Sequence, residues 1–164
     1  MLTRLVGEPL PAYAARVLFA PLGIRRWYWP RDPDGLAYGF AHLRLDTAAL
    51  AALGQLWLSG GRWRGVPLLD SGFAAEMYEP YTAGGWPEQA PYGHGFWRDA
   101  HGPFAGGWAG QHVMLVPAAG AVVVTTGDPR FDPGPPPTDR LPPDWRPARE
   151  LVTARLVPAL LAAG

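Results

Sequence analysis

Apolar residues recur at helical spacing in the first part of the chain. In residues 9–20, Tyr13 and Val17 lie one helical turn apart after a proline-rich start, and proline and glycine end the pattern. This spacing predicts a helix of about three turns. Residues 24–45 mix tryptophan and tyrosine with proline and glycine, which predicts an ordered loop with short extended pieces.

A stronger helical pattern follows Asp46, a residue type that favours the N-cap position. The apolar residues of 47–59 have amphipathic spacing, and two glycines directly afterwards end the helix. Asp70 starts a second capped pattern, which is helical until Pro80. Together these stretches predict a helix, a turn and a second helix.

The pattern changes to short extended runs near residue 92. Glycine, proline or aspartate separates these runs, which predicts three to four antiparallel strands within 92–128. The β-branched run 121–126 is predicted to be a central strand. Residues 129–147 contain eight prolines and are predicted to be a stiff connector, followed by an amphipathic helix over 148–162 that needs a sheet to cover.

Composition fits one α+β domain in which helices flank the antiparallel sheet. The chain is 48% hydrophobic and has eight tryptophans, which is enough apolar material for a core. Fourteen basic and fourteen acidic residues cancel, so no nucleic-acid partner is expected. No apolar run approaches the roughly 18 residues of a membrane span, so neither membrane insertion nor a signal peptide is expected.

The residue types that are missing restrict the possible chemistry. The sequence contains no lysine, asparagine or cysteine and only two serines, which excludes thiolate catalysis, disulfides and cysteine-based zinc sites. None of the four histidines has the helical spacing of a metal pair, and His94 and His112 are expected in strands as packed residues. Most acidic residues fall at helix caps or in turns, and no phosphate-binding loop or nucleophile motif occurs. The sequence therefore predicts no metal and no cofactor.

One predicted strand has an unusual composition. Ala105, Gly106 and Gly107 precede Trp108, and Gln111 leads into an apolar run. Glycine weakens a strand through its backbone entropy and its lack of packing surface, so these glycines need a physical reason. Two explanations are open: a bulge or crowded strand crossing, or a strand edge that a substrate backbone approaches closely.

Several segments, in this order and spacing, resemble the C-terminal half of the serine β-lactamase and penicillin-recognising hydrolase family. The resemblance is to its class C-like and esterase branches and extends over residues 4–128. The segments are LFAPLGI (18–24), WPRDPDG (29–35), ALAALGQLWLSGGRWRGVPLL (49–69), YGHGFW (92–97), GGWAGQHVMLVP (106–117) and AVVVTTGD (121–128).

The resemblance implies one antiparallel sheet, built from N-terminal and C-terminal strands, with helices on both sides. Its functional elements are Ser-x-x-Lys, Tyr-x-Asn and Lys-Thr-Gly. The first two cannot occur here, because Arg62 and Ala74 stand three residues after Ser59 and Ser71 and the chain lacks lysine and asparagine. In the family both elements precede the LFxPLG phrase. The chain is therefore expected to begin after them, so that residues 1–164 form a partial β-lactamase/transpeptidase-like domain without nucleophile or base.

The third element corresponds by position to Ala105, Gly106 and Gly107. The missing cation or hydroxyl argues against penicillin-like substrates. The resemblance implies that the backbone N–H of Trp108 forms half of an oxyanion hole, which depends on geometry and not on a particular side chain. It also implies that Trp108 and Gln111 line the substrate pocket.

Two functions follow from these observations. The first is the C-terminal portion of a serine hydrolase for ester, amide or lactam bonds, inactive alone. It predicts an unpaired sheet edge that binds a complementary N-terminal fragment or self-associates. The second is a non-catalytic binding or assembly module, which predicts a stable and monodisperse chain.

Overall fold

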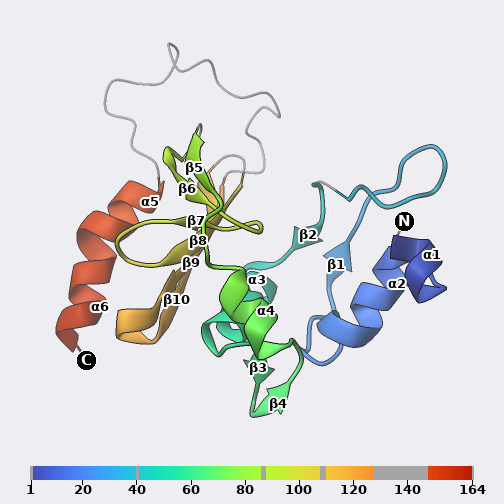
Figure 1. The fold of residues 1–164 in the computed structure, drawn as a ribbon, viewed down its shortest axis with the longest axis horizontal. Coiled ribbons are helices and arrows are strands. Elements are labelled where there is room, and N and C mark those ends of the chain that lie inside the picture. Colours follow the sequence, from blue (N-terminus) through green and yellow to red (C-terminus); the bar gives the residue numbers. More distant parts are fainter. Residues whose placement is uncertain (1, 40, 86–87, 108–109, 128–147, 164) are drawn as a thin grey trace.

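The computed structural model describes residues 2–39, 41–85, 88–107, 110–127 and 148–163. These residues form an α+β fold around an antiparallel sheet, as the sequence predicted, but the sheet has six strands where three to four were expected (Figure 1). The strands lie side by side in chain order: β5 (Thr82–Gly85), β6 (Ala90–Tyr92), β7 (Trp97–Arg98), β8 (Pro103–Gly107), β9 (Gln111–Val116) and β10 (Ala121–Thr125). β5 and β6 extend the sheet to residues before 92, where no strand was predicted.

A turn interrupts the extended pattern that was predicted from near residue 92. Tyr92 ends β6 and pairs with Trp97 of β7, while residues 93–96 form the turn between them. Gly95 has a φ of +87°, a left-handed conformation that glycine adopts without strain and that fits a tight turn. His94 therefore lies in this turn and not in a strand.

Within the described ranges β10 is an edge strand, which corrects its prediction as a central one. There it pairs with β9 alone, from Ala121 opposite Val116 to Thr125 opposite His112. A continuous β-branched run indicates that both faces of a strand are covered, and helices provide that cover here. Cover on both faces does not require a strand on both sides.

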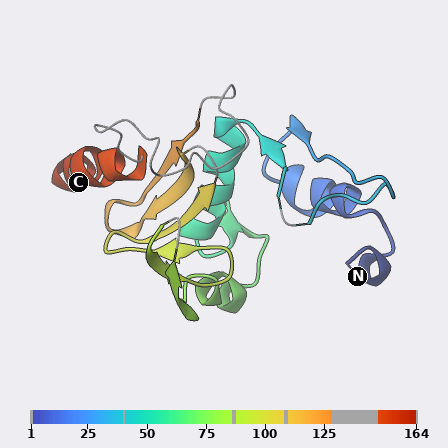
Figure 2. The ribbon, with the colours of Figure 1, turned by 90° about the horizontal axis from the view of Figure 1, so that it is seen from above.

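Helix α3 (Thr47–Leu58) covers one face of the sheet (Figure 2). The predicted N-cap is confirmed, because the Asp46 carboxylate accepts a hydrogen bond from the Ala49 N–H at 2.9 Å. Gly54 faces the strands: a Cβ atom there would lie 2.6 Å from Val122 Cγ1 and 2.9 Å from Val113 Cγ1. The helix backbone thus packs directly on β9 and β10.

The C-terminal helix (148–163) covers the opposite face of the sheet. Its parts are α5 (Ala148–Leu151), a π-helical segment (Val152–Leu156) and α6 (Val157–Ala163). Val152 and Val157 are buried with Phe104 and Met114, which confirms a C-terminal helix packed on the sheet. The predicted proline-rich connector over 129–147 lies outside the described residues.

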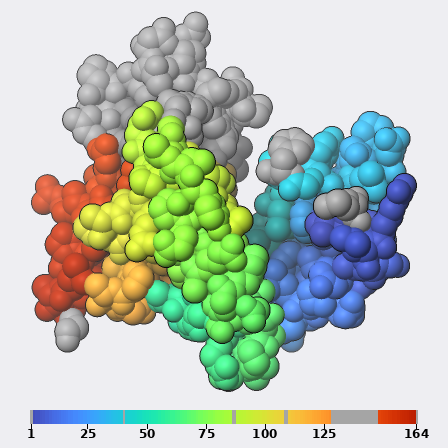
Figure 3. All heavy atoms as spheres, viewed as in Figure 1, coloured from blue at the N-terminus to red at the C-terminus, as the bar shows by residue number. Residues whose placement is uncertain are grey.

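The N-terminal part of the chain lies beside the sheet, on the side away from the C-terminal helix (Figures 1 and 3). Its elements are α1 (Leu2–Val6), α2 (Leu10–Ala14), a π-helical segment (Ala15–Phe19), β1 (Trp27–Tyr28) and β2 (Arg44–Leu45). The helix expected over 9–20 is confirmed, and β1 and β2 pair as the short extended pieces expected after it. Phe19, Ile24 and Leu56 are buried in the core that joins this part to α3.

The segment between the two capped helices is a small hairpin of β3 (Arg62–Trp63) and β4 (Val66–Pro67). After it, Asp70 caps α4 (Ser71–Glu76) by accepting from the Phe73 N–H at 2.9 Å. The helix is shorter than predicted: it ends at Glu76, and tighter turns lead to Pro80. The residue before a proline disfavours helical geometry, so the helix stops early. No helix in the described ranges has the length and apolar character of a membrane span.

Candidate functional site

The hairpin of β8 and β9 brings four of the five predicted site residues together. Ala105 lies opposite Val113, Gly106 opposite His112, and Gly107 opposite Gln111. Trp108, the predicted oxyanion donor, lies outside the described residues. Ala105, Gly106, Gly107 and Gln111 therefore mark one end of this hairpin.

Among the described residues, the second half of β8 has a strand neighbour on one side only. β7 pairs with Phe104 and Pro103 and then ends, so residues 105–107 have no ladder partner on the β7 side within the described ranges. Backbone N–H and C=O groups at such an edge can pair with an added extended segment. This geometry fits the strand-edge explanation for the glycines.

The position of Glu88 gives a packing reason for glycine at residue 106 as well. A Cβ atom on Gly106 would lie 2.9 Å from Glu88 Oε1 and 3.4 Å from its Cδ. The Glu88 side chain is 12% exposed, so the carboxylate occupies enclosed space above this residue. This is side-chain crowding on the face of the sheet, which is neither the bulge nor the strand crossing that the sequence left open, and it is compatible with an open strand edge.

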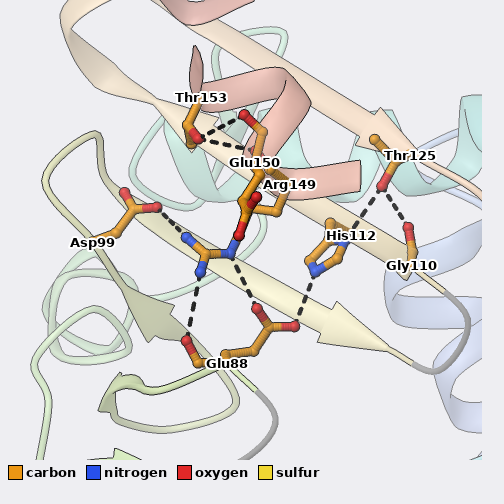
Figure 4. Close-up of polar contacts among 8 residues, drawn as sticks. All are labelled: Glu88, Asp99, Gly110, His112, Thr125, Arg149, Glu150 and Thr153. Atoms are coloured by element: carbon orange, nitrogen blue, oxygen red, sulfur yellow. Dashed lines mark hydrogen bonds and ion pairs between the residues drawn. The ribbon is translucent and has the colours of Figure 1, made fainter. Parts of the chain in front are cut away.

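Glu88 belongs to a polar network on the face of the sheet that the C-terminal helix covers (Figure 4). His112, whose side chain is 3% exposed, lies with Nε2 3.0 Å from Glu88 Oε1 and Nδ1 3.3 Å from Thr125 Oγ1. The Thr125 hydroxyl donates to the Gly110 carbonyl at 2.7 Å. His112 lies in a strand with both ring nitrogens in contact, as expected of a packed histidine.

Counting donors and acceptors shows which ring nitrogen donates to Glu88. An ionised carboxylate can only accept, so Nε2 of His112 donates to Glu88. The Thr125 hydroxyl hydrogen is directed at the Gly110 carbonyl, and His112 Nδ1 lies at the longer distance of 3.3 Å from Thr125 Oγ1. The hydrogen bond from His112 is the main cause that lowers the pKa of Glu88; burial opposes it, and the charges of His112 and Arg149 add to it.

Arg149, from the C-terminal helix, completes this network. Its Nε lies 3.0 Å from Glu88 Oε2 and its Nη1 lies 2.9 Å from Asp99 Oδ2. The guanidinium also stacks over the Phe104 ring, 4.5 Å from the ring centroid. The Arg149 guanidinium lies between the carboxylates of Glu88 and Asp99, so each of these largely buried charges has an opposite neighbour.

The network contains a hydroxyl, an imidazole and a carboxylate, the residue types of a nucleophilic relay. However, its hydrogen bonds do not have the direction that such a relay needs. In such a relay the hydroxyl donates to the imidazole, which acts as a base. Here the Thr125 hydroxyl donates to the Gly110 carbonyl and not to the imidazole. The arrangement holds segments of the chain together and does not activate Thr125.

Sequence reasoning missed Glu88 and Arg149. They are 61 positions apart, so no local spacing connects them. One weak signal exists, since Glu88 is the single acidic residue between Glu79 and Asp99. An isolated charge in an apolar stretch suggests a partner but does not identify it.

His94 lies away from this network, on the exposed turn before β7. Its ring contacts the Tyr81 ring at 4.5 Å, and its Nε2 lies 3.6 Å from Glu76 Oε1. Tyr81 donates to the same carboxylate oxygen at 3.0 Å. Among the described residues, no group of three or more histidine, aspartate or glutamate side chains is arranged to hold a metal ion.

Trp57 of α3 and Trp97 of β7 are half-buried. Trp97 packs on the cluster under the C-terminal helix, and the Trp57 ring contacts Phe96 at 5.3 Å. Trp57 Nε1 and the Tyr78 hydroxyl are buried without a hydrogen-bond partner among the described residues. Burial raises the pKa of Tyr78 to about 12, so this phenol stays protonated.

A hollow of about 300 Å³ lies elsewhere, between residues 22–26 and the first turns of α3. The ion pair of Arg26 and Asp46, at 3.1 Å, lies in its wall. None of the described candidate residues on β8 and β9 lines this hollow.

A scan of the chain against protein-family models gives no match, and neither does a search of the curated proteins.

Proposed function

We propose that this chain is the substrate-edge portion of a serine β-lactamase-related hydrolase that acts on ester, amide or lactam bonds. The main support is the second half of β8, where residues 105–107 pair with β9 on one side and have no described ladder partner on the other. An extended substrate can add to this edge through backbone hydrogen bonds. The nucleophile and its base then come from a complementary segment.

The β10 edge supports the need for such a segment. Val122 packs toward Gly54 of α3, while Val123 packs toward the cluster under the C-terminal helix. A strand covered on both faces resembles the interior of a sheet, yet β10 has no second strand neighbour within the described ranges. A complementary strand at this edge would continue the covered sheet.

The composition of β8 indicates which substrates fit. By the resemblance, Ala105 stands where the family has lysine or histidine, and Gly106 stands where it has threonine. Neither residue brings a cation or a hydroxyl. Arg149, whose guanidinium lies over Phe104 of β8, is already paired with Glu88 and Asp99. Neutral esters and amides therefore suit this edge better than substrates with a carboxylate next to the reacting bond.

The decisive experiment supplies the missing segment. The coding sequence upstream of residue 1 is read for an in-frame Ser-x-x-Lys, and that segment is co-expressed with this chain and purified as a complex. The complex should hydrolyse chromogenic ester or anilide probes, and alanine in place of the added serine should abolish the activity. A complex that forms but hydrolyses no ester, amide or lactam probe would overturn the hydrolase proposal.

A second function, a non-catalytic binding or assembly module, is favoured by one observation. Glu88 fills the space above Gly106, so packing explains this glycine without any substrate. Under this alternative the chain should be monomeric in sedimentation at all concentrations, with strong protection of the β10 amides from hydrogen exchange. Concentration-dependent association would count against it.

A further inference from the structure

We propose that the C-terminal helix sets the position of the β8–β9 hairpin through a continuous path from Arg149 to Gly110. Its importance for catalysis depends on the proposed function, but the mechanical coupling itself does not. Glu88 and His112 are then positioning residues for the strand edge at 105–107.

The first step joins the helix to the sheet. Arg149 lies in the first turn of the C-terminal helix. Its Nε contacts Glu88 at 3.0 Å and its Nη1 contacts Asp99 at 2.9 Å. Its stacking on Phe104 places the guanidinium directly over β8. These contacts exist only while the helix is docked.

The second step joins Glu88 to the candidate strand edge. One carboxylate oxygen is held by Arg149, and the other lies 2.9 Å from the position of a Cβ on Gly106. The Glu88 carboxylate therefore packs directly against residue 106. Because Arg149 holds this carboxylate, a shift of Arg149 changes the packing of Glu88 on β8.

The third step reaches the end of the hairpin. His112, which is opposite Gly106, links Glu88 to Thr125 of β10, and Thr125 donates to the carbonyl of Gly110. Gly110 has a φ of +78° and is the described residue just before β9, so this bond fixes the chain where it enters that strand.

Charge pairing makes these steps cooperative. Removing one member of a largely buried ion pair leaves its partner uncompensated, which costs more than the pair itself contributes. If the helix undocks, Glu88 and Asp99 both lose their ion pair with Arg149. Release of the helix should therefore loosen the hairpin, although the two share few backbone contacts.

The coupling is tested by NMR on the full chain with Arg149→Ala and, as a matched control, Arg155→Ala on the exposed face of the same helix. Arg149→Ala should shift the Gly106, Gly107 and Gly110 amides and the His112 ring nitrogens. It should also speed exchange of the β8–β9 ladder amides roughly tenfold or more. Arg149→Lys keeps the positive charge but loses the forked guanidinium, so its shift changes and its increase in exchange rate should both be smaller than those of Arg149→Ala. Unchanged hairpin signals in a folded Arg149→Ala chain would overturn the coupling.

Hydrogen exchange of the unmodified chain provides a test if the variant does not fold. At increasing denaturant, amides of the β8–β9 ladder and of residues 153–157 should converge on one opening free energy, since coupled segments open together. Independent opening would overturn the coupling and leave the hydrolase proposal untouched. A failed hydrolysis assay would leave these exchange results unaffected.

Discussion

Glycines in this protein matter as much for the space left free by their missing side chain as for their backbone freedom. The Glu88 carboxylate lies over Gly106, held between His112 and Arg149, and reaches its position because residue 106 has no side chain. Gly107, the next residue, has only ordinary neighbours: a Cβ there would lie 3.4 Å from Gln111. Adjacent glycines of one strand therefore have different physical roles.

Replacing Gly106 with alanine should destabilise the protein by about 1–3 kcal/mol, because the new Cβ displaces a carboxylate that is fixed on both sides. Gly107→Ala is the matched control, and we expect it to cost less than about 1 kcal/mol. Urea unfolding followed by circular dichroism measures both free energies. Equal effects of the two substitutions would contradict the packing role of Gly106.

Glu88 should make stability depend on pH in the acid range. Its pKa is lower in the folded state than its usual value of 4.5, so its stabilising contribution is present above about pH 4.5 and is lost as the pH falls through the folded-state pKa. Glu88→Gln should cost about 2 kcal/mol at pH 7, and this difference should shrink toward pH 3.

The control for Glu88→Gln is Glu79→Gln, because Glu79 forms an exposed ion pair with Arg98 at 3.7 Å. Exposed pairs contribute little, so this change should cost less than about 1 kcal/mol at any pH. The measurement is urea unfolding at several pH values between 3 and 7. A gap between wild type and Glu88→Gln that stays constant with pH would argue against the folded-state pairing of Glu88.

Among the elements, α3 shows best how local and tertiary effects compete. Asp46 and the amphipathic pattern define this helix locally, but Gly54 in its interior lowers helix propensity. The structure gives the reason for this glycine. Because Gly54 has no Cβ, the helix axis lies close to β9 and β10, and valine side chains occupy the space that a Cβ would need. The sheet requires a residue that the isolated helix disfavours.

Gly54→Ala should therefore destabilise the protein even though alanine favours helices. The gain in propensity is about 1 kcal/mol, and overpacking against Val113 and Val122 costs about 1–3 kcal/mol. Gln55→Ala, at the neighbouring exposed position, should change stability by less than about 0.5 kcal/mol. Thermal and urea unfolding distinguish the two, and a stabilising Gly54→Ala would show that α3 does not pack this closely.

At the scale of the whole molecule, the central feature is a sheet whose last strand is covered but not paired on its outer side within the described ranges. Both faces of β10 are under helices, and its residues are half-buried. Exposed backbone groups beside an apolar, β-branched strand favour pairing with another chain. The isolated chain should therefore associate with itself.

Sedimentation should show concentration-dependent dimers whose β10 amides gain protection from hydrogen exchange. Successive residues of a strand direct their N–H groups to opposite sides, so one of Val123→Pro and Val124→Pro removes an outer N–H and the other a ladder N–H. The outer variant should keep the fold and lose association, whereas the ladder variant should be destabilised. A monomer at every concentration would refute pairing through this edge.

The sequence by itself determined the local elements. Asp46 and Asp70 begin helices because their carboxylates bond to nearby N–H groups, and the β-branched run at the end of the sheet forms a strand. The strand order, the edge position of β10 and the contacts around Glu88 were decided only by the tertiary structure. Each of these depends on residues far apart in the chain, such as Glu88 and Arg149, whose pairing leaves no periodic pattern to read.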